Sequence, residues 1–406
     1  MTAVGSDTMM SESEELRCGA RKKLKPYVRL NLLTKREHEK DKCELCERIG
    51  SLMCRNCQVT FYCGMEHYTL DKDIHVVLCS RVKELRKPIE FNSQAQTRER
   101  WLKQRRIRME ELYKFTWTRG QAHLEEGKYD SAIPAATVSI KYANELFGQA
   151  PEVIPPLLIT AECYLQKGKL KVADGFLARA LSIEATWTDI RPFIKARIRR
   201  NEGLIHLARN KLSDALECFA EEIYQSTEEF GPYHIRTSGG YCYLGHVFHL
   251  QGRYETSTSL FRQTVKIWID HLEPILEEMN HQSYLPFIAG ALKTETDRVW
   301  MEDPDKFEGL RLLTKCYIQQ LETPTSHATA LDHATTCYAI SIMNYICERY
   351  NEAKAKAAEG QARILQGSLM KNTINSKLHH VIRFCDKKLF QLEKTTAQSS
   401  ETSISE

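Results

Sequence analysis

The chain has 406 residues and carries 57 Lys and Arg against 53 Asp and Glu, which gives a formal net charge of +4. It is 42% hydrophobic and 27% charged, a balance typical of folded domains. At roughly 150 residues per domain, its length predicts two to three domains. The small net charge excludes a global electrostatic field for nucleic acid or a membrane surface, so any basic contact must be local.

Fourteen cysteines are the unusual feature of the composition. The first residues, MTAVGSDTMMSESEELR, contain no apolar stretch that could serve as the core of a signal peptide. No later window approaches about 18 uninterrupted apolar residues, so we expect no transmembrane span. The setting that these features predict is intracellular and reducing, where clustered cysteines bind metal more often than they form disulfides.

Six of the cysteines and two histidines fall within one short segment, positions 43 to 79. They form two Cys-x2-Cys pairs, then a Cys-x3-His and a His-x3-Cys pair: Cys43, Cys46, Cys54, Cys57, Cys63, His67, His75 and Cys79. A Cys-x2-Cys turn presents two sulfurs to one tetrahedral zinc ion, and the last two pairs have the spacing of one helical turn. Eight donors predict two structural zinc ions with no open position for catalysis. A redox Cys-x2-Cys would need a βαβ setting that is absent here.

This pattern resembles the MYND zinc finger, and the resemblance implies an interleaved arrangement of two sites. It assigns the first zinc ion to Cys43, Cys46, Cys63 and His67, and the second to Cys54, Cys57, His75 and Cys79. His67 stands where most MYND fingers have cysteine, but histidine is an equally good zinc donor. So short a segment has too small a core to fold alone, so metal binding should supply its folding free energy.

MYND fingers in general bind short peptides, often ones that contain proline. The exposed candidates for such a contact here are Gln58, Val59, Thr60 and Phe61. The alternative is that Phe61 and Tyr62 form the small core of the finger.

From about residue 115 the sequence repeats with a period of 41 or 42 residues. Small residues recur at Gly120, Ala161, Gly203 and Gly245. Further columns keep this register: Gly127, Gly168, Asn210 and Gly252; Tyr129, Leu170, Leu212 and Tyr254; Ala132, Ala173, Ala215 and Ser257; Ala136, Leu177, Phe219 and Phe261. The columns predict a repeated helical hairpin, in which Gly or Asn ends the first helix in the left-handed conformation.

These hairpins resemble the tetratricopeptide repeat, whose units bury their apolar faces by stacking on one another. The usual period is about 34 residues, so this chain carries about eight more per unit, as in the kinesin light chain subclass. Toward the C-terminus Glu348 replaces the turn glycine, and Phe307 marks a divergent unit. The fold class that follows is mainly α: a small two-zinc MYND finger followed by an α-solenoid of tetratricopeptide-like helical hairpins.

The predicted organisation has seven parts. They are a basic, disordered segment (1–39), the finger (43–79), a basic linking helix (80–114), four repeats (115–272), divergent repeats (273–375), a capping helix (376–394) and a disordered tail (395–406).

Three further groups of histidine and cysteine could be considered as metal ligands. Cys242 with His246 and His249 share one face of a helix, and the other two groups are His333 with Cys337 and the adjacent pair His379 and His380. A third metal site would need a fourth donor that we do not find, so we expect the first group to line the concave groove of the solenoid.

Two stretches are rich in cations, residues 17–40 and residues 98–108 around Trp101. The plain interpretation is a solvated tail and a solvated helix face. The alternative is a contact with an acidic polymer such as tubulin tails or RNA. RPFIKARIRR, at 191–200, reads as the polar face of a repeat helix.

Signatures of catalysis are missing from the sequence, which lacks GxxxxGK[ST], HExxH, GxSxG and a strand-linked GxGxxG. The SET-MYND methyltransferases also join a MYND finger to helical repeats, and they carry an Asn-His-x-Cys-x-Pro-Asn motif. The nearest string here is NHQSY, at 280–284, which lacks the Cys, the Pro and the second Asn. We therefore predict that the chain is not an enzyme.

A finger followed by repeats is an uncommon order. With the strings CGMEH (63–67), EGKYDSAIPAA (126–136) and GPYHIRTSGGYCYL (231–244), it resembles a family of ciliary MYND-finger proteins with tetratricopeptide-like repeats. The resemblance implies a non-enzymatic assembly adaptor of the axoneme in motile cilia and sperm flagella. It also implies association with inner dynein arms and with tetratricopeptide repeat protein 29, through the solenoid groove. The alternative is a cytosolic or nuclear peptide-binding scaffold of the corepressor type.

Overall fold

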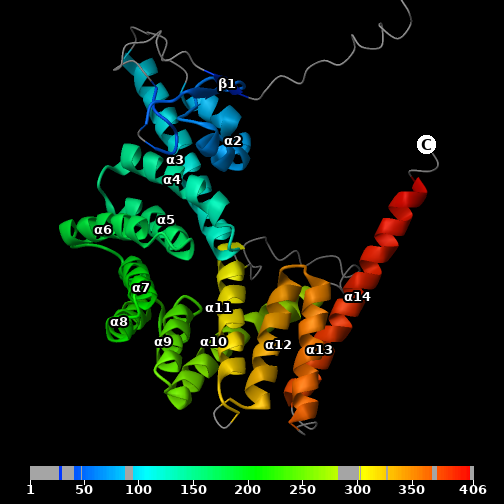
Figure 1. The fold of residues 1–406 in the computed structure, drawn as a ribbon. Helices are drawn as coiled ribbons and strands as arrows, with labels where there is room; N and C mark the ends of the chain where they lie inside the picture. The colour runs from blue at the N-terminus through cyan, green and yellow to red at the C-terminus, as the bar shows by residue number, and fades with distance from the viewer. Residues whose placement is uncertain are drawn as a thin grey trace, which may run out of the picture. The chain divides into compact units, whose positions relative to one another are not determined.

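The computed structural model describes residues 27–29, 41–46, 48–86, 95–281, 301, 303–325, 328–367 and 373–402. The chain divides into two compact units, Met1–Ser93 and Gln94–Glu406 (Figure 1). The basic segment predicted at 1–39 therefore falls outside the described residues, except for Tyr27–Arg29. The last residues of the predicted tail, 403–406, also lie outside them.

The first unit contains a small antiparallel sheet of order β1-β2-β3. Its strands are β1 (Tyr27–Arg29), β2 (Leu52–Cys54) and β3 (Phe61–Tyr62). Tyr27 pairs with Cys54, and Leu52 pairs with Tyr62. The prediction of disorder before residue 40 is wrong for Tyr27–Arg29, because these residues add a strand to the sheet of the finger.

Aromatic rings form the core of this unit. The ring of Tyr62 is fully buried and lies 5.5 Å from that of Tyr68, which in turn lies 5.1 Å from the ring of Tyr27. Phe61 is only half-buried, so Tyr62 rather than Phe61 is the core residue.

One helix, α2 (Met65–Leu85), completes the unit. Arg86 follows its last residue and reaches both oxygens of Glu44, at 2.7 and 2.8 Å, and the carbonyl oxygen of Val59, at 2.9 Å. These bonds tie the end of the helix to the loops before β2 and before β3. Residues 80–85 of the predicted linking helix thus belong to α2.

The second unit begins with four helical hairpins (Figure 1). Their helices are α3 (Ala95–Glu125) with α4 (Tyr129–Phe147), α5 (Ile154–Gln166) with α6 (Leu170–Thr186), α7 (Pro192–Ala208) with α8 (Leu212–Phe230), and α9 (Ser238–Leu250) with α10 (Tyr254–His281); a short 3-10 turn, η2 (Pro151–Val153), precedes α5. The first helices of successive hairpins contact one another, α3 with α5 and α5 with α7. The prediction of a tetratricopeptide-like α-solenoid is confirmed.

The sequence columns meet at the hairpin interfaces. A Cβ atom added to Gly203 would lie 2.7 Å from the ring of Phe219, and one added to Gly245 would lie 2.8 Å from that of Phe261. Both phenylalanines are fully buried. Only glycine lets the two helices of these hairpins approach so closely, so the first column sets their spacing.

The turn column adopts the left-handed conformation throughout. The φ angles are 76° at Gly127, 71° at Gly168, 58° at Asn210, 74° at Gly252 and 61° at Glu348. Glu348 therefore takes the turn conformation although it has a side chain, which costs about 1 kcal/mol more than in glycine.

In the part of the chain that the structure describes after the hairpins, four helices follow: α11 (Asp303–Glu322), α12 (Ala330–Ile346), α13 (Tyr350–Gln366) and α14 (Thr373–Thr402). α12 and α13 form a fifth hairpin around Glu348, and α14 packs on both of them. The linking helix predicted at 80–114 does not exist as a separate element, since residues 95–114 are the first part of α3. The disorder predicted from residue 395 is also wrong up to Thr402, because α14 continues to that residue.

We predict that Glu348→Gly stabilises the second unit by about 1 kcal/mol, because glycine adopts the left-handed conformation without steric cost. Gly168→Ala is the matched control in the opposite direction, since the space around Gly168 is open and only its φ of 71° resists a side chain. The midpoint of denaturant unfolding, followed by circular dichroism, should rise for the first variant and fall for the second. A lower midpoint for Glu348→Gly would contradict the argument.

Candidate metal centre and the inner face of the solenoid

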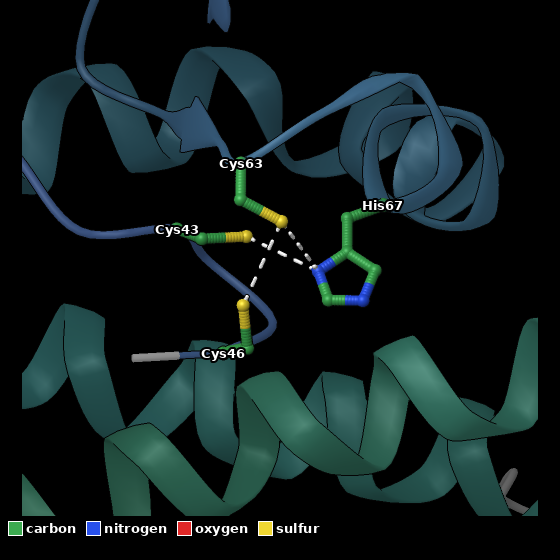
Figure 2. Close-up of side chains that lie close together, drawn as sticks. All are labelled: Cys43, Cys46, Cys63 and His67. Atoms are coloured by element: carbon green, nitrogen blue, oxygen red, sulfur yellow. Dashed lines mark hydrogen bonds between the residues drawn. The ribbon is translucent and has the colours of Figure 1, made fainter. Parts of the chain in front are cut away.

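The eight candidate ligands of the first unit come together in two groups of four. The first group is Cys43, Cys46, Cys63 and His67 (Figure 2), and the second is Cys54, Cys57, His75 and Cys79. Within each group the ligand atoms all lie within 4.8 Å of one another. The eight residues are thus divided between the two groups in the interleaved way that the resemblance implied. Either group could hold a metal ion.

Distances within each group match the edges of a tetrahedron around one zinc ion. The sulfurs of Cys46 and Cys63 lie 3.7 Å apart, and those of Cys54 and Cys79 lie 3.9 Å apart. With zinc–sulfur bonds of about 2.3 Å, a tetrahedral edge is about 3.8 Å.

The histidines complete the two tetrahedra. Nδ1 of His67 lies 3.3 Å from the sulfur of Cys43 and 3.4 Å from that of Cys63. Nε2 of His75 lies 3.6 Å from the sulfur of Cys57. A nitrogen–sulfur edge around zinc is about 3.5 Å, so both donor sets fit the ion.

Local electrostatics favour a thiolate at one cysteine of each group. Hydrogen bonds with the Cys54 side chain, then with His75 and Thr60, lower the pKa of Cys57 in spite of its burial. Burial opposes ionisation of Cys46, but hydrogen bonds with Arg48 outweigh it and lower the pKa of this thiol as well. The hydrogen bond with Cys57 raises the pKa of Cys54, and burial raises the pKa of Cys63 and Cys79. Thiolates are the metal-binding form of cysteine, so each group contains one thiol whose ionisation is favoured before a cation binds.

The strand proposed for peptide binding is less accessible than the sequence indicates. Thr60 is only 1% exposed, because its side chain hydrogen-bonds with the sulfur of Cys57. The carbonyl oxygen of Phe61 accepts a hydrogen bond from the backbone of Glu44 at 2.8 Å. Residues 58–61 therefore do not offer a free strand edge, and the prediction of an exposed Thr60 is wrong.

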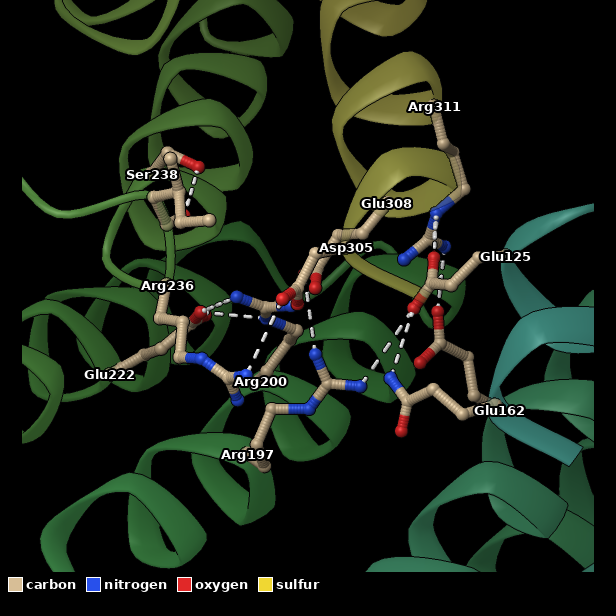
Figure 3. A network of polar contacts seen from close by, with 12 residues as sticks. Glu125, Glu162, Arg197, Arg200, Glu222, Arg236, Ser238, Asp305, Glu308 and Arg311 are labelled. Atoms are coloured by element: carbon tan, nitrogen blue, oxygen red, sulfur yellow. Dashed lines mark hydrogen bonds and ion pairs between the residues drawn. The ribbon is translucent and has the colours of Figure 1, made fainter. Parts of the chain in front are cut away.

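In the second unit, α11 lies against the first helices of the hairpins, on the concave inner face. Arg311 reaches Glu125 of α3 at 2.8 Å and Glu162 of α5 at 2.7 Å. Glu308 pairs with Arg197, at 3.2 Å, and with Arg200, both from α7 (Figure 3). This helix thus does not occupy a repeat position, and the interpretation of Phe307 as the mark of a divergent repeat is wrong.

The ion pairs of α11 are largely buried, since Glu308 is 14% and Arg311 22% exposed and most of their partners are less so. The side chains of Glu125, Glu162, Arg200 and Glu222 are at most 1% exposed, and Arg200 also binds Glu222 at 2.6 Å. Burial by itself raises the pKa of Glu308, but Arg200, Arg197 and Arg311 outweigh it and lower this pKa to about 2. Burial raises the pKa of Glu125 to about 7 even though Arg311 opposes the shift. Each charge depends on its partner, because the low-polarity interior gives it no water.

This network was missed from the sequence. RPFIKARIRR resembles an exposed polar face, yet Arg200 is fully buried and Arg197 nearly so, and both face α11. One signal of this network was present in the sequence, the acidic residues on the first helices of other hairpins. The spacing of residues along one helix does not reveal which distant segment packs against it.

Among the described residues no further group of metal ligands comes together outside the finger, and two of the three groups contact α11 residues instead. His246 hydrogen-bonds with Gln319 at 2.9 Å, and the sulfurs of Cys242 and Cys316 lie 3.6 Å apart. His333 bonds the carbonyl oxygen of Gln320 at 3.1 Å. The first group does line the concave face, as predicted, but α11 covers it there.

No known protein-family profile matches the chain. Among solved structures it is similar to BtubC from P. vanneervenii, at 10% identity over 57% of this chain and 89% of that one, with a TM-score of 0.31. The apo form of RapI is 12% identical over 69% of this chain and 72% of that one, with a TM-score of 0.36. The TPR-like repeats assigned to a kinesin light chain of Podospora anserina are 14% identical over 53% of this chain and 96% of that one, with a TM-score of 0.28. With TM-scores below 0.5, these likenesses carry no function to this chain.

Among the described helices, none is both long enough and apolar enough to cross a bilayer.

Because removing one partner of a buried ion pair leaves the other charge uncompensated, Glu308→Gln should lower the free energy of unfolding by about 3 kcal/mol near neutral pH. The ordinary pKa of the carboxyl is 4.5 and the folded one is about 2, so ionised Glu308 stabilises the fold above pH 4.5. That contribution is lost as the pH falls toward 2, and the difference between the wild type and the variant should shrink over this range. Denaturant unfolding at several pH values measures it.

The matched control is Glu145→Gln, which removes an exposed ion pair with Arg105 at 3.0 Å. It should change the free energy of unfolding by at most about 1 kcal/mol. Equal effects of the two substitutions would contradict a special role for the buried network.

Proposed function

We propose that the chain is a non-enzymatic assembly adaptor that joins a zinc-stabilised finger to a protein-binding solenoid. The observation that carries this proposal is the combination of two four-ligand clusters with a stack of helical hairpins in one chain. A solenoid offers a long surface for proteins and no preformed chemistry, and closed four-ligand metal sites are structural.

The partner surface of this adaptor differs from an open groove, because α11 covers much of the concave face. Beside α11 a cavity of about 580 Å³ remains, and it is lined by the turn between α3 and α4, by one side of α11 and by Arg349. Ile318, which is 48% exposed, faces this cavity. We propose that a short segment of a partner protein binds in this cavity, and that larger partner surfaces bind to the second helices of the hairpins.

We assign zinc to both clusters of the finger. The donor sets are Cys3His in each case, the distances between donor atoms fit a tetrahedral zinc ion, and hydrogen bonds favour a thiolate at Cys46 and at Cys57. Bound zinc would supply folding free energy that the small aromatic core lacks.

The purified chain should contain two zinc ions, and Cys43→Ser or Cys54→Ser should each reduce this to about one, because each removes a donor from one cluster. Cys218→Ser is the matched control, since Cys218 on α8 belongs to neither cluster and should leave two ions. Elemental analysis measures the count. A chelator should unfold the finger and leave most of the helical circular dichroism, which comes from the second unit. Fewer than two ions in the wild type would contradict the two-site assignment.

Further, we place this adaptor in the axoneme of motile cilia and sperm flagella, in association with inner dynein arms. Support comes from the sequence resemblance, since the order of modules and the string CGMEH, at 63–67, are similar to zinc finger MYND domain-containing protein 12. On the same ground we name tetratricopeptide repeat protein 29 as a partner and tubulin tails as a contact of the basic segments. The alternative of a corepressor-type peptide scaffold loses support at residues 58–61, because Thr60 is buried and the carbonyl oxygen of Phe61 is already hydrogen-bonded.

If the axonemal proposal holds, tagged chain expressed in ciliated cells should stay with the axonemes after detergent extraction, and proximity labelling should mark inner-arm proteins and tetratricopeptide repeat protein 29. A tagged cytosolic protein of similar size is the control and should be extracted. Complete extraction of the tagged chain, or a nuclear location, would rule out the axonemal assignment and favour the alternative scaffold.

A further inference from the structure

The first helix of the second unit is longer than the helix that packs on it. α3 has 31 residues and α4 has 19, and α4 ends at Phe147. Arg105 pairs with Glu145, two residues before that end, at 3.0 Å. The turns of α3 before Arg105 therefore extend past its hairpin partner, and every residue from Ala95 to Gln104 is exposed except Trp101, which is half-buried.

This extension is strongly basic. Between Ala95 and Met109 the sequence has a single acidic residue, Glu99, and these exposed cations: Arg98, Arg100, Lys103, Arg106 and Arg108. Arg106 pairs with Glu110 at 3.2 Å. Among the residues that the structure describes, the other four have no carboxylate within ion-pair distance. Their mutual repulsion is thus relieved only by solvent and salt, which leaves an unmatched positive surface.

The cations are distributed around the whole helix. At 100° per residue, and with Arg100 taken as 0°, the other unpaired cations lie at about 80° (Arg108), about 160° (Arg98) and about 300° (Lys103) around the helix axis. A helix that binds a nucleic acid duplex contacts it with one of its faces. A site for single-stranded nucleic acid needs several aromatic side chains on which the bases stack. Only Trp101 lies in this stretch, and the guanidinium of Arg105 already lies 5.8 Å from the centre of its ring. A flexible polypeptide, in contrast, can follow charges around a helix.

We propose that the extension of α3, residues 95–108, binds a glutamate-rich acidic segment of a protein partner. The stretch is about 21 Å long at 1.5 Å per residue. About six extended residues would span that length in a straight line, so a segment that winds around the helix to reach all four cations must be longer. Acidic side chains of such a segment pair with Arg98, Arg100, Lys103 and Arg108 and leave the hairpin interface unchanged. This inference deepens the proposed adaptor function and rests on it, but it does not depend on a ciliary location.

Fluorescence anisotropy with the purified, metal-loaded full chain and a labelled peptide of about twelve glutamates tests the proposal. Binding should weaken steeply between about 50 mM and about 300 mM salt, because exposed charges are screened. Arg100→Glu with Lys103→Glu should weaken binding roughly tenfold at the lower salt, since two attractions become repulsions. Arg100→Gln with Lys103→Gln removes the charge without reversing it and should weaken binding roughly threefold.

The matched control is Lys171→Glu with Arg179→Glu on α6, which changes the net charge equally at two exposed positions. This variant should bind as the wild type does, and circular dichroism should show equal helix content in all four proteins. Equal loss in test and control variants would reduce the effect to net charge and overturn the proposal, as would binding that salt does not weaken. Tighter binding of a labelled single-stranded oligonucleotide, lost in the test variant, would overturn it in favour of nucleic acid. Wild-type binding in both test variants would overturn it too, whatever the location of the chain in cells.

Discussion

The second unit depends on the burial of ionised side chains beneath α11. A charge that has lost its water must keep its partner, and here the partners lie on different hairpins. Arg311 is held by Glu125 and Glu162, from the first and second hairpins, while Glu308 is held by arginines of the third. A change in the angle between successive hairpins would separate at least one pair, so the network fixes the curvature that apolar stacking alone leaves adjustable. Close packing adds to this constraint, because a Cβ atom on Gly309 would lie 2.7 Å from the ring of Trp268 and 2.5 Å from Met343.

The first unit meets the opposite problem. It has few apolar residues to bury: beside three tyrosine rings and several ligand side chains, its core contains Leu52 and four aliphatic residues of α2, namely Ile74, Leu78, Val82 and Leu85. Eight sulfur and nitrogen donors gathered into two groups repel one another when the thiols ionise, unless cations lie between them. The bidentate bond between Arg86 and Glu44 closes the unit by joining the last helical turn to the first ligand loop. The chain thus combines one unit stabilised by coordination with another stabilised by packing and ion pairs.

Local rules and periodicity made much of this predictable. The spacing of cysteine and histidine defined the eight residues of the two clusters, because both Cys-x2-Cys turns and one-turn helical pairs have fixed geometry. The columns around Gly127 predicted turns that the φ angles confirm, even at Glu348, where the residue type disagrees with the conformation. The position of α11 was not predictable, since its contacts join residues more than a hundred positions apart, as Arg200 and Glu308 are. Charged residues such as Arg197 look solvated in a sequence whenever their partners come from another part of the chain. The helix at 395–402 was missed for a different reason: it prolongs α14 through backbone bonds and needs no apolar stripe.

An open solenoid behaves as a spring, because each unit touches only its neighbours and small rotations add up along the stack. Here α11 bridges the inner face from the first hairpin to the fourth, with Arg311 at Glu125 and Gln319 at His246. Pulling the ends of these hairpins apart would have to break several buried ion pairs at once instead of distributing a small strain over many stacking contacts. The stack therefore resists extension, and it should lengthen only when the ion pairs and hydrogen bonds to α11 break together.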